Sequence, residues 1–244
     1  MSTRLGGSLI TNPAEVRTSS ATQQAPLGAY IESIDGRGFR YVQNGATVMV
    51  FGNVYQSSAE STNHQNLVPR AAAVGDTDIA VTLGATAAGL DEYAGGLAIV
   101  TANAGEGECY TIVGHAVVAS SGTLTATLAA PIKRAITTSS TIDLVRNPYK
   151  SVVVAPTTVT GAVVGVALHD IGASEYGWVQ THGPTAVRAG VALVVGLTVV
   201  RSTGTAGAVE PATGETGDVA ANKLGYVLTG VATSEFGAVY LTID

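Results

Sequence analysis

The sequence predicts an all-β protein made of short-strand β-sandwich or barrel units with an extended N-terminal arm. Two observations predict this class. Short β-branched segments, in which apolar and polar residues largely alternate, recur along the chain and are separated by Gly, Asp, Asn or Pro. In contrast, no long window keeps the i, i+3, i+4, i+7 apolar stripe of an amphipathic helix. We therefore expect strands joined by turns and no long helix.

The expected strands are short and rich in Val, Ile, Thr and Tyr. Between two of them, the segment 85–93 places good helix formers between glycines, and there we expect one helical turn. The strands are expected at residues 39–43, 46–51, 78–83, 96–101, 123–128, 141–145, 176–181 and 237–243.

Four regions of the chain differ in composition. Residues 1–35 are rich in Ser, Thr, Gln and Pro and too poor in apolar residues for a core, which predicts an extended arm that orders only against a neighbour, or a frayed terminus. Residues 36–69 are expected to form a β-hairpin linker region. Residues 70–150, bounded on both sides by proline, form one β domain, and residues 151–244 form a second.

The last region contains an internal repeat. Residues 164–180 (VGVALHDIGASEYGWVQ) align without a gap with residues 224–240 (LGYVLTGVATSEFGAVY), 60 positions further on. Both copies predict a strand, a turn that contains Ser-Glu, and a return strand that starts with an aromatic residue and a glycine. Two such copies suit a small sandwich or barrel. The identical pairs are Gly165 and Gly225, Leu168 and Leu228, Ser174 and Ser234, Glu175 and Glu235, Gly177 and Gly237, and Val179 and Val239.

Composition and charge narrow the class of function. Charged residues make up 12% of the chain, about half of the average for soluble domains, and the net charge is -6. The chain has no basic stripe for nucleic acid. Its apolar stretches 151–168 and 189–200 are interrupted by Gly or Pro and are too short to span a membrane. The single Cys109 excludes an internal disulfide. We expect a soluble protein made in a reducing compartment.

The densest cluster of polar residues consists of His169, Asp170, Glu175 and His182. His169 and Glu175 could approach each other across the predicted turn as a His–carboxylate pair for general acid–base catalysis. The second copy of the repeat, however, has Thr229 and Glu235 at these two positions. A Glu that is kept without its His is better explained as a turn cap that accepts backbone N–H bonds. The sequence therefore favours a protein that is not an enzyme.

Other candidates for chemistry are weak. Cys109 follows Glu106 and Glu108, whose carboxylates disfavour a thiolate. Asp76 and Asp78 begin like a calcium loop, but the Gly and the distal Glu of such a loop are missing. We predict no catalytic residue and no cofactor, and we leave a metal near Asp76 and Asp78 open.

Three stretches carry a resemblance to a known class of proteins. Residues 74–115, residues 146–190 and residues 224–244 resemble structural proteins of the virions of tailed bacteriophages. The stretch that contains SEYGWVQTHGP is also similar in character to small head-decoration proteins of the lambda phage type. The features that carry this resemblance are compositional and turn-based rather than catalytic.

The resemblance implies a decoration, or cement, protein. Such a protein would bind the outer surface of the phage head as a homotrimer and stabilise the shell by bridging neighbouring subunits of the major capsid protein. It would lie on the virion after synthesis in the cytoplasm of the host bacterium, without contact to nucleic acid or membrane. The residues expected to contact the capsid are Arg4, Arg17, Arg37 and Arg40.

Two alternatives remain open at this point. The chain could be a head-fibre base or a tail-associated virion β-protein. The third interpretation is a virion-associated hydrolase built on His169, Glu175 and His182.

Overall fold

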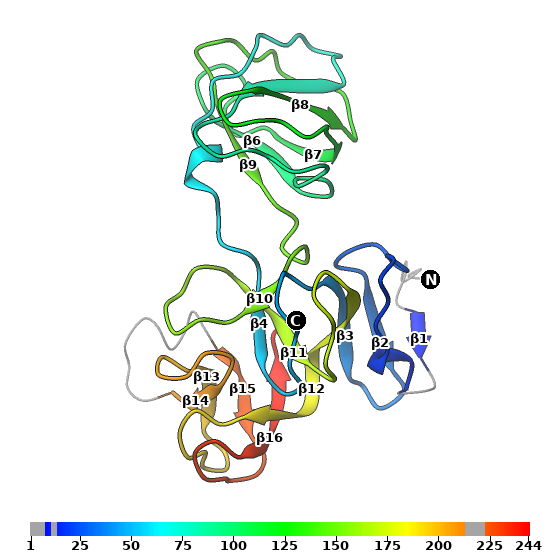
Figure 1. Cartoon of the computed structure of the whole chain (residues 1–244), viewed down its shortest axis with the longest axis vertical. Coiled ribbons are helices and arrows are strands. Elements are labelled where there is room, and N and C mark those ends of the chain that lie inside the picture. The colour runs from blue at the N-terminus through cyan, green and yellow to red at the C-terminus, as the bar shows by residue number, and fades with distance from the viewer. Residues whose placement is uncertain (1–7, 11–13, 213–222) are drawn as a thin grey trace, which may run out of the picture. The chain divides into compact units, whose positions relative to one another are not determined.

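The computed structural model of the chain describes residues 8–10, 14–212 and 223–244. Strands joined by turns make up the described residues (Figure 1), which confirms the predicted all-β class. They contain no α-helix and only two 3-10 helices, η1 (Glu15–Arg17) and η2 (Thr62–His64).

The chain folds as two compact units. Unit 1 consists of Met1–Ser58 and Pro148–Asp244, and unit 2 of Ala59–Asn147. Unit 1 holds an eleven-stranded sheet. Its strands are β1 (Ser8–Ile10), β2 (Tyr30–Ser33), β3 (Gly38–Gln43), β4 (Val54–Gln56), β10 (Val153–Val154), β11 (Val163–Ala167), β12 (Tyr176–Arg188), β13 (Thr198–Arg201), β14 (Val209–Pro211), β15 (Lys223–Val227) and β16 (Phe236–Thr242).

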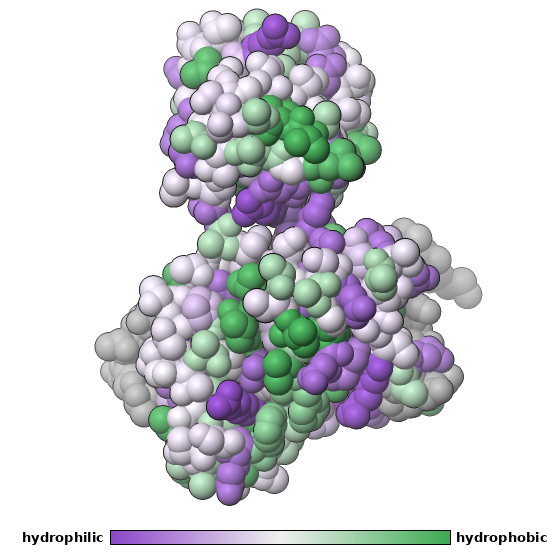
Figure 2. Space-filling view, viewed as in Figure 1, coloured by the Kyte–Doolittle hydropathy of each residue, from purple (hydrophilic) through white to green (hydrophobic). Residues whose placement is uncertain are grey.

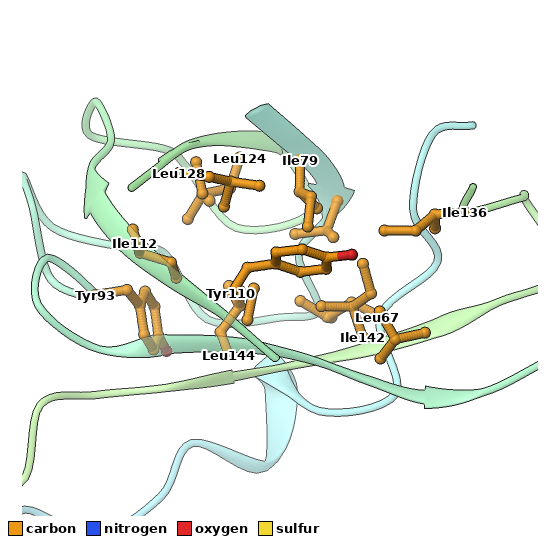
Figure 3. Close-up of a cluster of buried hydrophobic side chains, with 14 of the residues drawn as sticks. Leu67, Ile79, Tyr93, Tyr110, Ile112, Leu124, Leu128, Ile136, Ile142 and Leu144 are labelled. Atoms are coloured by element: carbon orange, nitrogen blue, oxygen red, sulfur yellow. The ribbon is translucent and has the colours of Figure 1, made fainter. Parts of the chain in front are cut away.

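Unit 2 holds a five-stranded antiparallel sheet in the order β5-β8-β7-β6-β9. Alternation of apolar and polar residues directs one side of each strand inward; in β8, for example, Leu124, Ala126 and Leu128 are buried. Figure 3 shows the resulting cluster of Leu, Ile and Tyr side chains. The strands are β5 (Asp78–Thr82), β6 (Leu97–Ala102), β7 (Cys109–Gly114), β8 (Thr123–Leu128) and β9 (Thr141–Val145).

This division differs from the one that the sequence predicts. Residues 36–58 are not a linker, because β3 and β4 hydrogen-bond to β12 and β11 inside unit 1. Residues 59–69 belong to unit 2, where Leu67 pairs with Ile142. The helical turn expected at 85–93 is also absent, because this segment forms turns and an isolated bridge instead.

Residues 14–35 are ordered against their own chain rather than extended as a free arm. The side chain of Val16 is buried in unit 1, Ser20 pairs with Tyr176, and β2 pairs with β3. The rest of the predicted arm, apart from β1, lies outside the described residues, and so does Arg4.

Unit 1 is built from two copies of one β motif that share strand β12. Repeat A consists of β3, β4, β10, β11 and the first half of β12; repeat B consists of the second half of β12, β13, β14, β15 and β16. In repeat A, Tyr55 of β4 pairs with Gly165 of β11. In repeat B, Val199 of β13 pairs with Gly225 of β15. The strand pairings of the two repeats therefore correspond one to one, so the repeat seen in the sequence is part of a larger duplication.

The two repeats also bury equivalent cores. Met49, Ile171 and Val179 of repeat A have Leu193, Val231 and Val239 as counterparts in repeat B. The repeat A core contains Val42, Met49, Tyr55, Val152, Val164, Ala167, Ile171 and Val179. The repeat B core contains Val187, Ala189, Leu193, Val199, Val209, Leu224, Val227, Val239 and Leu241, and Val54, Ala155 and Val166 from the repeat A part of the chain pack into the same cluster.

Unit 2 is an insertion into repeat A. In repeat B, β13 and β14 form a hairpin closed by residues 202–208. The equivalent strands of repeat A, β4 and β10, also pair with each other, but residues 59–147 of unit 2 lie between them in the chain. The hairpin ends can remain paired because loop length adds only slowly to the entropy of closure.

A glycine is required at one position in each repeat. Gly165 and Gly225 have φ of +150° and +158°, and a Cβ at Gly225 would lie 1.8 Å from the carbonyl oxygen of Tyr240. That contact is with backbone, which cannot move away without breaking the β15–β16 pairing. This explains why both copies of the sequence repeat keep the glycine.

We expect Gly225→Ala to lower the stability of unit 1 by about 1–3 kcal/mol, because the added methyl group forces the two strands apart. Gly204→Ala is the matched control, since a Cβ added at Gly204 would have the Ser202 hydroxyl, 4.0 Å away, as its nearest neighbour. Chemical denaturation of both variants measures the difference. Equal stability of the two variants would show that the strands separate without cost.

Candidate functional site

The polar cluster predicted around His169 is not brought together as a catalytic group. Asp170 accepts a hydrogen bond from the Phe51 N–H at 2.8 Å. His182 contacts the Tyr240 hydroxyl and the Asp244 carbonyl at 3.2 and 3.3 Å. These contacts use separate partners in different parts of unit 1. Neither ring nitrogen of His169 has a hydrogen-bond partner among the described residues, so the His169–Glu175 pair considered from the sequence is not formed.

Glu175 and Glu235 cap equivalent turns, as the repeat predicts. Glu175 Oε2 accepts from the Gly172 N–H at 3.1 Å, and Glu235 Oε2 accepts from the Ala232 N–H at 2.9 Å. The turn position just before each glutamate is occupied by Ser174 and its counterpart Ser234, which have φ of +61° and +69°. A carboxylate that fixes a strained turn is a structural group.

The imidazole of His169 is the exception among the buried polar groups of the turn. Both ring nitrogens are buried, and neither has a hydrogen-bond partner among the described residues. Burial lowers the pKa of His169 below its ordinary value; the charge of Arg17 adds to this effect and Asp170 opposes it. At the equivalent place in repeat B, the Thr229 hydroxyl accepts from the Ala238 N–H at 2.9 Å.

The arginines expected to contact a capsid have different environments. Arg37 pairs with Asp35 at 2.8 Å. Arg40 pairs with Asp244 at 2.8 Å and donates to the Gly28 carbonyl, so that it ties the C-terminus to the sheet. Arg17 is exposed. Arg37 and Arg40 therefore hold the chain together, and of the described members of the set only Arg17 offers an exposed side chain.

The other residues singled out from the sequence lie apart. Cys109 is exposed at the start of β7. Asp76 accepts from the Ala73 N–H at 2.7 Å, and Asp78 is exposed at the start of β5. Among the described residues there is no group of three His, Cys, Asp or Glu side chains placed to hold a metal ion. Trp178 packs edge-on against Tyr41 with ring centres 4.9 Å apart.

Unit 2 contains a buried polar network that the sequence does not reveal. His64 Nε2 donates to the Thr86 carbonyl at 2.9 Å, so its Nδ1 accepts from the Tyr93 hydroxyl. The Tyr93 N–H in turn donates to His115 Nε2 at 3.1 Å. Burial raises the pKa of Tyr93 to about 12. Because each group has a partner of fixed direction, the network stabilises the fold and holds no free acid or base.

The most prominent surface feature of unit 1 is a pair of apolar loops at equivalent places in the two repeats. We call residues 45–52 and 189–197 the apolar loops. Met49 and Leu193 point into the cores, whereas Val194 and Val195 have 57% and 62% of their surface exposed. The other exposed large apolar residues of these loops are Val48, Val50, Phe51, Val191 and Leu197.

Sequence reasoning missed these loops because their residues are strand formers. Residues 46–51 were expected to form a strand, but only Met49 takes part in a β-bridge, with Ile171. The usable signal was the absence of an alternating polar residue in VMVF (48–51), since a half-exposed strand would show one. Figure 2 shows apolar residues on the visible surface of each unit, among residues of intermediate hydropathy.

Comparison with known proteins identifies no relative. No family model, no curated protein and no solved structure matches the chain. In the described part of the chain, no helix is long and apolar enough to cross a membrane.

We expect His169→Thr to remove part of the acid sensitivity of unit 1. The pKa of His169 is lower in the folded protein than in the unfolded chain. Below the ordinary His pKa of about 6.5, the unfolded chain therefore binds a proton that the folded protein does not, and the free energy of unfolding decreases as the pH is lowered. Thermal unfolding from pH 7 to pH 5 should show a smaller loss for His169→Thr than for the native chain. Parallel losses would contradict the assignment.

We expect Tyr93→Phe to lower the stability of unit 2 by about 1–3 kcal/mol, because buried His64 Nδ1 then lacks a donor. Tyr226→Phe is the control, since its ring is partly exposed. Chemical denaturation measures each variant by the unfolding of the unit that carries the substitution, unit 2 for Tyr93→Phe and unit 1 for Tyr226→Phe. An unchanged stability of Tyr93→Phe would rule out a structural role for the network.

Proposed function

We propose that the protein is a decoration protein of a tailed-phage head, which binds the outer surface of the capsid and bridges neighbouring subunits of the major capsid protein. The observation that carries the proposal is the pair of apolar loops. Exposed apolar side chains that gather on a weakly charged surface are typical of protein contact sites. The two loops present the same type of surface twice in unit 1, whose strands form one sheet.

Unit 2 offers a second surface of the same kind. Leu90 and Val117 are 67% and 68% exposed. Their segments are held together by the Ala88–Val118 bridge and by the hydrogen bond from the Asp91 N–H to the His115 carbonyl at 3.1 Å. A protein that bridges two subunits needs at least two contact surfaces, and each unit provides one. A homotrimer on the virion is part of the same proposal, since closed oligomers repeat one patch by symmetry.

The interior contacts of the polar side chains support this function over a virion hydrolase. Glu175 caps a turn and His182 contacts Tyr240, so the residues on which the hydrolase interpretation depended serve the fold. The apolar loops also fit a head-fibre base or a tail-associated protein, and the experiment below separates these positions.

We expect the purified protein to co-sediment saturably with emptied, expanded capsids of its parent phage and to raise their melting temperature, because a ligand of the assembled shell alone must stabilise it. Val194→Asp with Val195→Asp should abolish binding without unfolding the protein. Val159→Asp, another exposed valine of unit 1, is the matched control. If neither the native chain nor the control variant binds the capsids, the decoration function is wrong and a position in the head fibre or the tail is favoured.

A further inference from the structure

The outer faces of the two repeats differ in their cover: in the described part of the chain, a segment lies over the outer face of repeat A and none lies over that of repeat B. The outer face is the side of β11 and β12, or of β15 and β16, that points away from the repeat's core. Leu168, Tyr176 and Trp178 lie on the outer face of repeat A. The equivalent positions in repeat B, 60 residues further on, are Leu228, Phe236 and Ala238.

In repeat A the covering element is the segment 14–24. Val16 packs with Leu168 and Phe39, and all three side chains are buried. The Ser19 hydroxyl donates to Glu175 Oε2 at 2.8 Å. These contacts give the segment a fixed register on the face.

The backbone of the segment also joins the sheet. The Ser20 N–H donates to the Tyr176 carbonyl at 3.0 Å, and the Tyr176 N–H donates to the Ser20 carbonyl at 2.8 Å. The segment therefore joins repeat A by one antiparallel β-bridge at Ser20, with one aliphatic anchor and one hydroxyl contact.

The outer face of repeat B has no described segment over it. Leu168 is 3% exposed, whereas its counterpart Leu228 is 38% exposed, and Phe236 is 49% exposed. Glu235, the counterpart of the glutamate that Ser19 contacts, is exposed as well. Phe51 stacks on Phe236 with ring centres 5.6 Å apart and forms one wall of the face.

The backbone at Phe236 is oriented to accept a strand. The Ala189 N–H donates to the Glu235 carbonyl at 2.8 Å, which makes Arg188 and Phe236 a non-hydrogen-bonded pair of the β12–β16 ladder. The Phe236 N–H and C=O therefore point away from β12, toward the side on which Ser20 bonds Tyr176 in repeat A. No described residue forms a bridge with Phe236 on that side.

We propose that the outer face of repeat B, formed by Tyr226, Leu228, Glu235, Phe236 and Ala238, binds an extended segment of a partner protein. The segment places an aliphatic side chain on Leu228, a hydroxyl on Glu235 and its backbone against Phe236. The chain's own segment 14–24 is not the occupant of this face, because it is bound to repeat A. The backbone N–H and C=O of Phe236 point outward together, as one donor beside one acceptor. This arrangement matches the backbone of an extended peptide better than a lipid or a sugar. This site goes beyond the proposed function and does not require it.

The test uses a peptide with the sequence of residues 14–22, AEVRTSSAT, which is taken from the segment that covers the equivalent face of repeat A. It is titrated into the full-length protein and followed by amide chemical shifts. We expect saturable binding, with a Kd on the order of 1 mM or tighter, and shifts centred on residues 228–238. Leu228→Asp should weaken binding about tenfold or more. Val117→Asp on unit 2 should bind like the native chain.

A peptide with Asp in place of its valine is the matched ligand control and should not bind. Three results would overturn the proposal: no saturable binding, equal binding by Leu228→Asp, or shifts confined to residues 168–178. Burial of the face by a second copy, detected as concentration-dependent association that Leu228→Asp abolishes, would also overturn it. None of these readouts involves a capsid, so failure of capsid binding and failure of this site are distinguishable.

Discussion

Strand β12 is the element on which unit 1 depends, because both repeats hydrogen-bond to it. Its first half pairs with β3 and β11, and its second half pairs with β16. Val179 and Val187 are fully buried, one in the core of each repeat. The register shifts between Gln180 and His182, where the Gln180 amide donates to the carbonyls of His182 and Pro184 at 2.8 and 3.0 Å. This bulge lets one strand serve two equivalent motifs.

Duplication explains why the two repeats have equivalent cores but different outer faces. Equivalent cores require similar residues, so Met49 and Ile171 are matched by Leu193 and Val231. The outer faces carry no such requirement, and there Trp178 is matched by Ala238. One face is covered by the chain's own segment 14–24, and within the described residues no segment lies over the other. The apolar loops, in contrast, are exposed in both repeats.

The sequence predicted what depends on local pattern. The all-β class followed from alternation, and the turn caps Glu175 and Glu235 followed from their retention without a common His. The rest of the duplication was hidden because residues 38–56 and 183–200 share a strand arrangement but little sequence; they are aligned by their pairing partners, not by identity. The insertion of unit 2 was hidden for a related reason, since the pairing of β4 with β10 joins residues far apart in the chain.

Charged residues were predicted least well. The sequence predicts Arg37 and Arg40 as capsid contacts, whereas in the structure Arg37 pairs with Asp35 of the neighbouring turn and Arg40 pairs with Asp244 at the end of the chain. The partner of Arg40 lies 204 positions away in the sequence and leaves no local signal. The exposed apolar side chains are the better guide to contact with another protein, because burying them releases free energy in proportion to their area, whereas exposed ion pairs contribute little.

The central claim is that unit 1 is one cooperative body in which both repeats depend on β12. Hydrogen exchange of the backbone amides along residues 176–188 tests it most directly. The account predicts that Val179 and Val187 exchange at one common free energy, that of unfolding all of unit 1. A much lower free energy of exchange at Val187 than at Val179 would show that repeat B opens on its own, and would contradict the account.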